Sequence, residues 1–175
     1  MSNLLNERRN RTRRITAFAV LLLLTCAWIA VIFSFSSTGG EKSSSQSQAI
    51  TERVVRVVDK DYEMPEKTEP ESKDRLYDNV VRKTAHVFTY TVLGVLMFLT
   101  VRSLTAQRKN NAFALKLSVP LSIIVAAADE YNQSHVEGRS GRVSDVFIDS
   151  AGIILGTALC LLLFKYSAKR KSQKA

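Results

Sequence analysis

A long uncharged stretch near the N-terminus limits what this chain can fold into. From Ile15 to Phe35, 21 consecutive residues include no Asp, Glu, Lys, Arg or His. A helix of roughly 20 residues, rising about 1.5 Å per residue, crosses the apolar layer of a bilayer. The stretch therefore predicts a transmembrane helix and excludes an entirely soluble fold.

A basic segment, residues 1–14, precedes this helix, as in a secretory signal. The apolar stretch is longer than the apolar part of a typical signal, which is about 7 to 15 residues. We therefore predict that residues 15–35 are an uncleaved membrane anchor. Cys26 follows Leu-Leu-Thr, so lipidation of this cysteine is a minor alternative.

Three weaker apolar stretches follow, at residues 84–101, 112–128 and 146–164. Each contains a polar residue that a helix surrounded by lipid would avoid, so we expect these polar residues to face other helices. The chain is predicted to be an all-α, polytopic membrane protein with four transmembrane helices.

The basic residues indicate how these helices are oriented. The chain has 25 Lys and Arg against 16 Asp and Glu, a formal charge of +9. Thirteen of the 25 lie in residues 1–14, in the connection 102–109 and in the tail 165–175. Short basic flanks stay cytoplasmic, so we predict cytoplasmic termini and a multi-pass location in the cell membrane. Contact with anionic membrane lipids explains the charge, and nucleic acid is not a predicted partner.

Residues 36–81 are predicted to form an external loop. The loop opens with serines and glycines and stays Ser-rich to Ser47, a composition that cannot build a core. From Ala49 to Val58 apolar residues recur at helical spacing, which suits an interfacial helix. Residues 82–164 supply the three remaining helices of the predicted membrane core.

Polar residues recur along one face of the second predicted span. Arg82, His86, Tyr90 and Gly94 are four residues apart and share a helix face, with Lys83 one step round. The stripe starts at the predicted external boundary and descends toward the bilayer centre. It must therefore face other helices.

Charged residues of the third and fourth spans, and of the loop between them, are predicted at the same boundary. In the loop, Gly138 and Gly141 permit a tight backbone path, and two arginines offer planar donors that suit an anion. Gly152 and Gly156 permit close helix contact on the face that carries Asp149. The charged residues predicted at this boundary are four basic and four acidic ones: Arg82, Lys83, Arg139 and Arg142, and Asp129, Glu130, Asp145 and Asp149.

Together with three further polar side chains, these eight residues form the predicted ligand-binding set. The additional members are His86, Tyr90 and Gln133. No catalytic residue is assigned, and the candidates for such a role are His86, Glu130 and Asp149. No metal-ligand spacing is compelling, and no cofactor is implied.

Structural interpretations compete with functional ones at the acidic and histidine positions. His86 is either a packed imidazole bonded to Asp149 or Tyr90, or a proton shuttle near neutral pH. Asp129 and Glu130 could perform acid/base work or hold a divalent cation. We expect at least one of the two to be a solvated helix end.

The two loop arginines and the acidic residues of the fourth span also have both a structural and a functional interpretation. Arg139 and Arg142 either belong to a solvated loop or bind a phosphate, pyrophosphate or carboxylate. Asp145 and Asp149 could bridge to the cations of the second span and so fix the arrangement of the bundle.

The ordered set of motifs resembles the VanZ-like family of bacterial membrane proteins, from about Ile29 to Phe164. The matching pieces are Phe35-Ser36-Ser37; Arg82-Lys83-x-x-His86 with Tyr90 and Gly94; Asp129-Glu130-x-x-Gln133; and Arg139-x-x-Arg142-x-x-Asp145 with Asp149, Gly152 and Gly156. The family often has Gln and Pro where this chain has Thr38-Gly39-Gly40, which puts the role of the loop in doubt. The resemblance implies a cell-envelope protein related to one associated with low-level teicoplanin resistance.

Three functions fit these observations. In the first, an external polar pocket binds an anionic lipid-linked wall precursor or a glycopeptide antibiotic and so affects resistance. In the second, the protein is a membrane enzyme that performs acid/base chemistry on a lipid phosphate. In the third, the charged residues only hold together a structural or partner-binding bundle. Some relatives carry a phosphotransbutyrylase label, which these residues do not support.

Overall fold

The computed structural model describes residues 2–38, 72–104, 111–139 and 141–173. These residues form four helices: α1 (Ser2–Ser36), α3 (Ser72–Leu104), α4 (Ala112–Gln133) and α5 (Val143–Ser172). All four are long and apolar enough to cross a membrane. The described part of the chain contains no strand, so the predicted all-α fold with four membrane-spanning helices is confirmed.

The helices extend beyond the apolar stretches that predicted them. Helix α1 includes almost all of the basic segment 1–14, and α3 begins at Ser72 within the stretch expected to be loop. Helix α5 continues through most of the basic tail. Hydropathy marks only the part of a helix that lies in hydrocarbon, whereas Lys and Arg are good helix formers that continue it into water. The predicted interfacial helix at 49–58 lies outside the described residues.

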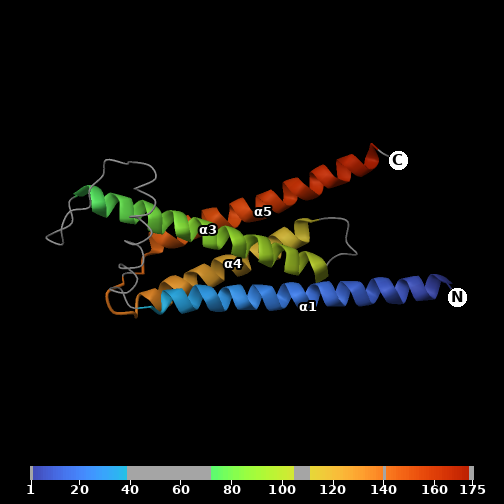
Figure 1. Cartoon of the computed structure of the whole chain (residues 1–175), viewed down its shortest axis with the longest axis horizontal. Coiled ribbons are helices and arrows are strands. Elements are labelled where there is room, and N and C mark those ends of the chain that lie inside the picture. The colour runs from blue at the N-terminus through green and yellow to red at the C-terminus, as the bar shows by residue number, and fades with distance from the viewer. Residues whose placement is uncertain (1, 39–71, 105–110, 140, 174–175) are drawn as a thin grey trace.

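The helices run along the long axis of the molecule as a bundle (Figure 1). Both termini lie at one end, which we call the termini end and which fits an even number of spans. The opposite end, the loop end, holds the end of α1, the start of α3, the end of α4 and the start of α5. Helix α3 contacts each of the other three, and its contact with α5 is the most extensive.

Glycines bring α3 and α5 unusually close together. A Cβ atom at Gly94 would lie 2.5 Å from the carbonyl oxygen of Ile153, and one at Gly152 would lie 2.6 Å from that of Val87. A Cβ at Gly156 would collide with the carbonyl oxygen of Thr91. The backbones of the two helices therefore touch along this seam, as the glycine spacing of the fourth span predicts.

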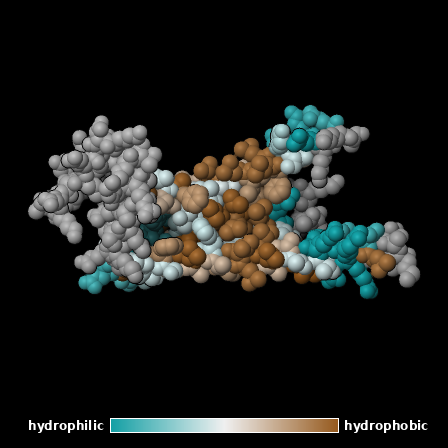
Figure 2. Space-filling model, in the orientation of Figure 1, coloured by the Kyte–Doolittle hydropathy of each residue, from teal (hydrophilic) through white to brown (hydrophobic). Residues whose placement is uncertain are grey.

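Two apolar clusters fill the interior, and apolar residues also cover the outside. One cluster centres on Tyr90 and Leu93, and the other on Phe98 and Cys160. Figure 2 shows a hydrophobic band around the middle of the bundle and hydrophilic residues toward its ends. Large side chains in this band are exposed, among them Leu23, Ile124, Ile154 and Leu162. An exposed apolar girdle of this kind matches the hydrocarbon of a bilayer.

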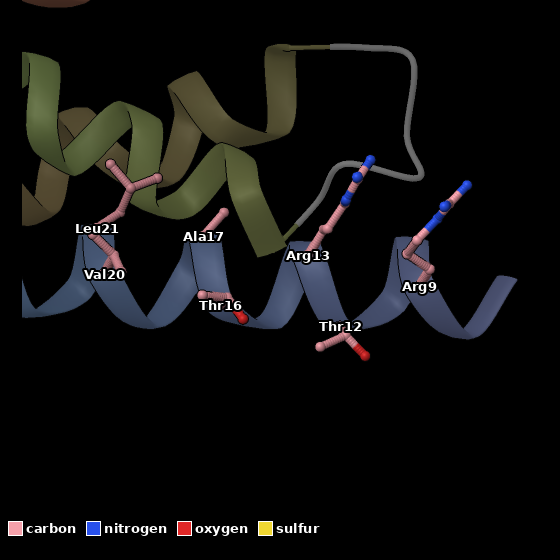
Figure 3. Close-up of a pocket in the computed structure, with 7 residues that line it drawn as sticks. All are labelled: Arg9, Thr12, Arg13, Thr16, Ala17, Val20 and Leu21. Atoms are coloured by element: carbon pink, nitrogen blue, oxygen red, sulfur yellow. The ribbon is translucent and has the colours of Figure 1, made fainter. Parts of the chain in front are cut away.

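The termini end carries a surface pocket on α1 (Figure 3). Its lining combines two arginines with apolar and hydroxyl side chains: Arg9, Thr12, Arg13, Thr16, Ala17, Val20 and Leu21. All seven residues come from α1, so the pocket is a groove along this one helix. Arginines beside apolar residues at the end of a span suit the headgroup level of a membrane.

We predict that Gly156→Leu destabilises the bundle by about 1 to 3 kcal/mol, the usual cost of overpacking. The new side chain would push against the backbone of α3 at Thr91. Unfolding of the purified protein with increasing SDS measures the change. Ala151→Leu is the matched control, because Ala151 lies exposed on the same helix. Equal stability of the two variants would contradict the close contact between α3 and α5.

Candidate functional site

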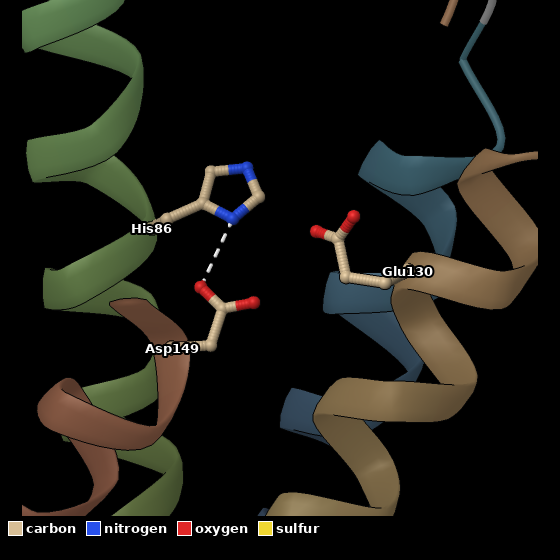
Figure 4. Close-up of side chains that lie close together, drawn as sticks. All are labelled: His86, Glu130 and Asp149. Atoms are coloured by element: carbon tan, nitrogen blue, oxygen red, sulfur yellow. Dashed lines mark hydrogen bonds and ion pairs between the residues drawn. The ribbon is translucent and has the colours of Figure 1, made fainter. Parts of the chain in front are cut away.

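Three helices each contribute one side chain to a compact polar cluster at the loop end. His86 comes from α3, Glu130 from α4 and Asp149 from α5. One nitrogen or oxygen atom from each residue lies within 4.8 Å of those from the other two. Figure 4 shows the imidazole and the two carboxylates pointing toward one another. The structure thus joins the three residues singled out as catalytic candidates, which are far apart in the sequence.

His86 and Asp149 form a direct pair. Nδ1 of His86 lies 3.1 Å from Oδ1 of Asp149, within hydrogen-bond and ion-pair distance. The Asp149 side chain is completely buried, whereas that of His86 is 24% exposed. Of the two partners proposed for His86, the structure selects Asp149, because the Tyr90 hydroxyl donates to Asp129 instead. The carboxylate fixes the orientation of the imidazole, whose other edge is open to the site.

Asp129 is held by two donors that join α3 to α4. The Tyr90 hydroxyl donates to Oδ2 of Asp129 over 2.8 Å, and Nε2 of Gln133 donates to the same oxygen over 2.9 Å. The side chains of Asp129 and Glu130 are both buried. The expectation that at least one of them is a solvated helix end is therefore wrong. The α4–α5 loop and the neighbouring helices cover this end of α4, which the sequence pattern alone could not indicate.

The loop between α4 and α5 folds back over Glu130. The backbone N–H of Arg142 donates to Oε2 of Glu130 over 3.0 Å. A Cβ at Gly141 would collide with the carbonyl oxygen of Glu130, so the loop can approach α4 this closely only with glycine. Gly138 supplies the turn before it with a φ of 75°. The glycines predicted to give a tight path do so, and they fix the position of the loop arginines.

Positive charge surrounds the cluster without entering it. Arg82, Lys83 and Arg142 are exposed, and Arg139 is half-buried. Burial lowers the pKa of Arg139, and the nearby charge of Arg82 lowers it further, while Asp129 and Glu130 act in the opposite direction. Arg139 keeps its proton at neutral pH, because an arginine pKa lies far above 7. Two cations therefore lie close together beside buried acids.

The predicted bridges between the fourth span and the second are not formed. Within the described residues, no ion pair links Asp145 or Asp149 to Arg82 or Lys83, and Asp149 is paired with His86 instead. Asp145 is half-buried and accepts a 3.4 Å hydrogen bond from the Ser144 hydroxyl. Asp149 pairs with His86 because it lies one turn further along α5 than Asp145 and is therefore level with His86 in the bundle.

The end of α1 also belongs to this site. The Ser36 hydroxyl accepts a 3.2 Å hydrogen bond from Nε2 of Gln133, and the Ser37 hydroxyl accepts one of the same length from Asn132. Ser36 is buried. From the sequence, these serines are predicted to open the external loop and belong to a motif of the family resemblance, but not to the ligand-binding set. A polar residue at the end of an apolar span was the signal that could have identified Ser36 as a contact between helices.

We predict that Tyr90→Phe destabilises the protein by about 1 to 3 kcal/mol, because it removes a donor from a buried carboxylate. A double-mutant cycle with Asp129→Asn should show that the two changes are not additive. Tyr131→Phe is the control, since Tyr131 is 70% exposed, and it should change stability by less than about 0.5 kcal/mol. Additive effects of Tyr90→Phe and Asp129→Asn would contradict the hydrogen bond.

Comparison with known proteins identifies the family. The family model described as VanZ/LLP1 matches residues 20–164, which include every member of the polar cluster, all of α3 and α4, and parts of α1 and α5. A comparison with curated proteins and one with solved structures gave no match. Four candidate spans together with this match describe a multi-pass membrane protein. The resemblance noted in the sequence is confirmed, and the chain belongs to the VanZ/LLP1 family.

Proposed function

We propose that this protein binds an anionic, lipid-linked ligand, such as a cell-wall precursor, at the outer boundary of the cell membrane. The observation that carries the proposal is the half-buried Arg139 in a loop whose backbone is held against Glu130 of α4. Together with the exposed Arg82 of α3, it offers two guanidinium groups to one anion. Phosphate and pyrophosphate groups match their planar donors in bidentate geometry.

The arginine loop has a fixed position, which favours binding. Its backbone is held against α4 by the Arg142 N–H bond to Glu130 and by the close approach at Gly141. A positioned loop loses little conformational entropy when a ligand arrives. The half-buried Arg139 therefore offers its charge with less ordering cost than a mobile surface arginine.

Exposed apolar side chains at the membrane level of the site, on the outward faces of α3 and α5, favour a lipid-linked ligand over a soluble one. Phe88, two residues after His86, is 65% exposed, and Phe147, two residues before Asp149, is 72% exposed. Both belong to candidate membrane spans. A polyprenyl chain could lie against them while its phosphate reaches the arginines. A glycopeptide antibiotic is the alternative ligand that the experiment below distinguishes.

The proposal requires the loop end to face outward. The basic flanks predict cytoplasmic termini, so topology reporters fused at Ser45, Gln107 and Ser172 should report outside, inside and inside. Alkaline phosphatase and green fluorescent protein fusions give complementary readings of the two sides. A reversed pattern would direct the site toward the cytoplasm and contradict the proposal.

We predict that Arg82→Ala combined with Arg139→Ala weakens binding of undecaprenyl diphosphate at least tenfold, since each charge-assisted bond contributes about 1.5 to 3 kcal/mol. Binding is measured with the full chain in nanodiscs by microscale thermophoresis. The matched control removes two arginines at the termini end, Arg9→Ala with Arg13→Ala, and should keep the wild-type affinity.

Two outcomes would contradict this prediction. The first is equal affinity of the wild type and the Arg82/Arg139 variant for the diphosphate. The second is binding of teicoplanin but not of the diphosphate, which would support the glycopeptide alternative. The resistance that the family resemblance implies is measured separately, as the teicoplanin concentration that inhibits a susceptible host producing either variant.

One observation favours a second candidate function, acid/base chemistry on a lipid phosphate. The His86 imidazole is oriented by Asp149 and faces Glu130, an arrangement in which a proton donor and acceptor stand near one another. In this candidate the arginines hold the phosphate and His86 transfers a proton. Release of inorganic phosphate from undecaprenyl diphosphate by the purified protein, abolished by His86→Ala, would distinguish it from binding alone.

A further inference from the structure

We infer that His86, Glu130 and Asp149 form a binding site for one divalent transition-metal cation of the Zn²⁺ or Mn²⁺ type. The three residues offer one imidazole nitrogen and two carboxylate groups from three different helices. The site goes beyond the proposed function and does not rest on it, because metal binding can be measured without any lipid ligand.

The spacing of the donor atoms suits a single metal ion. All three candidate ligand atoms lie within 4.8 Å of one another. Bonds from Zn²⁺ to nitrogen and oxygen are about 2.0 to 2.2 Å, so two ligands of a tetrahedral ion are separated by about 3.3 to 3.6 Å. Rotation of the Glu130 and Asp149 side chains would bring their oxygens closer to the imidazole.

An unpartnered oxygen points into this space. Oδ1 of Asp149 is paired with His86, but Oδ2 is buried and accepts no hydrogen bond from the described residues. Figure 4 shows this second oxygen on the side of Asp149 that faces Glu130. The whole Asp149 side chain has 0% exposure, so bulk water does not solvate it. A carboxylate oxygen has only acceptor capacity, and a metal ion is one of the few partners that can satisfy it there.

The charge of the cluster also favours a cation. Glu130 and Asp149 contribute two carboxylates to the site, and the buried Asp129 lies nearby in the same network. The side chains of Arg82 and Arg142 are exposed. Carboxylates buried away from water are stabilised by a directly bound cation. A divalent ion would balance the two that belong to the site.

Surrounding hydrogen bonds hold the proposed ligands in position. Oε2 of Glu130 accepts from the backbone of Arg142, and Oε1 accepts from Gln133 over 3.3 Å. Hydrogen bonds of this kind orient metal-binding carboxylates and histidines in known sites. Three protein ligands would leave further coordination positions open, as in catalytic rather than structural metal sites.

The donor set selects the type of metal. One imidazole with two carboxylates suits Zn²⁺, Mn²⁺ and related ions. Calcium prefers six to eight oxygen ligands, and Mg²⁺ usually keeps several waters and few protein ligands. We therefore expect Zn²⁺ and Mn²⁺ to bind more tightly than Ca²⁺ and Mg²⁺ do.

The test uses the full chain in nanodiscs, without a histidine tag and after treatment with a chelator. Isothermal titration with Zn²⁺, and separately with Mn²⁺, should give one equivalent per chain. Asp149→Asn keeps the size of the side chain and should weaken binding at least 100-fold, as should His86→Ala. Saturating Zn²⁺ should also raise the melting temperature of the wild type but not that of Asp149→Asn.

The chain provides a matched control, because its only other histidine is His135. His135 is exposed, and its ring lies 4.6 Å from that of Tyr131, away from the cluster. His135→Ala should bind Zn²⁺ like the wild type. If His86→Ala does not fold, Glu130→Gln replaces it in the titration. The arginine variant, Arg82→Ala with Arg139→Ala, should keep its Zn²⁺ site, so failure of the lipid proposal and failure of this one are distinguishable.

Several results would overturn the inference. Absence of binding to the wild type would do so, and so would equal Zn²⁺ affinity in the wild type and Asp149→Asn. Loss of the site in His135→Ala would show that the metal binds elsewhere. Tighter binding of Ca²⁺ or Mg²⁺ than of Zn²⁺ and Mn²⁺ would overturn the proposed metal type.

Discussion

The cost of burying carboxylates within a membrane bundle constrains the rest of this structure. Asp129, Glu130 and Asp149 are nearly or completely buried at the ends of apolar helices. A charge in this position is tolerated only with partners, and each of these acids has at least one partner from another element. Tyr90 and His86 reach from α3, and the backbone of Arg142 reaches from the loop. Satisfying the acids therefore fixes how α3, α4 and α5 meet.

Close packing and polar chemistry depend on one another at the contact between α3 and α5. Gly152 lies against the backbone of Val87, which is the residue after His86. Asp149 precedes Gly152 by three residues and so lies on the same face of α5. The short distance between the backbones allows the small Asp149 side chain to reach the imidazole, whose nitrogen is 3.1 Å away. A larger residue at Gly152 would separate the two helices and the pair together.

Much of this arrangement could be predicted from the sequence, because periodicity determines which residues share a face. The uncharged run at 15–35 predicted the first span, and the four-residue spacing of His86 and Tyr90 predicted a stripe that faces the bundle. Periodicity does not determine how far apart two facing helices lie. It therefore left open whether Asp149 meets His86 or Arg82, and it could not indicate that Glu130 is covered by its own loop.

The separation of charge within the site argues against a purely structural role for it. If these residues only held the bundle together, pairing Arg82 with the acids would satisfy both at once. The structure instead has acids in the centre and cations at the rim, with an oxygen of Asp149 unpartnered among the described residues. The bond from Tyr90 to Asp129 is explained by stability alone, whereas this oxygen is not. It is explained if the centre holds the inferred cation, and a phosphate bound as proposed could then bridge this cation and the basic residues around it.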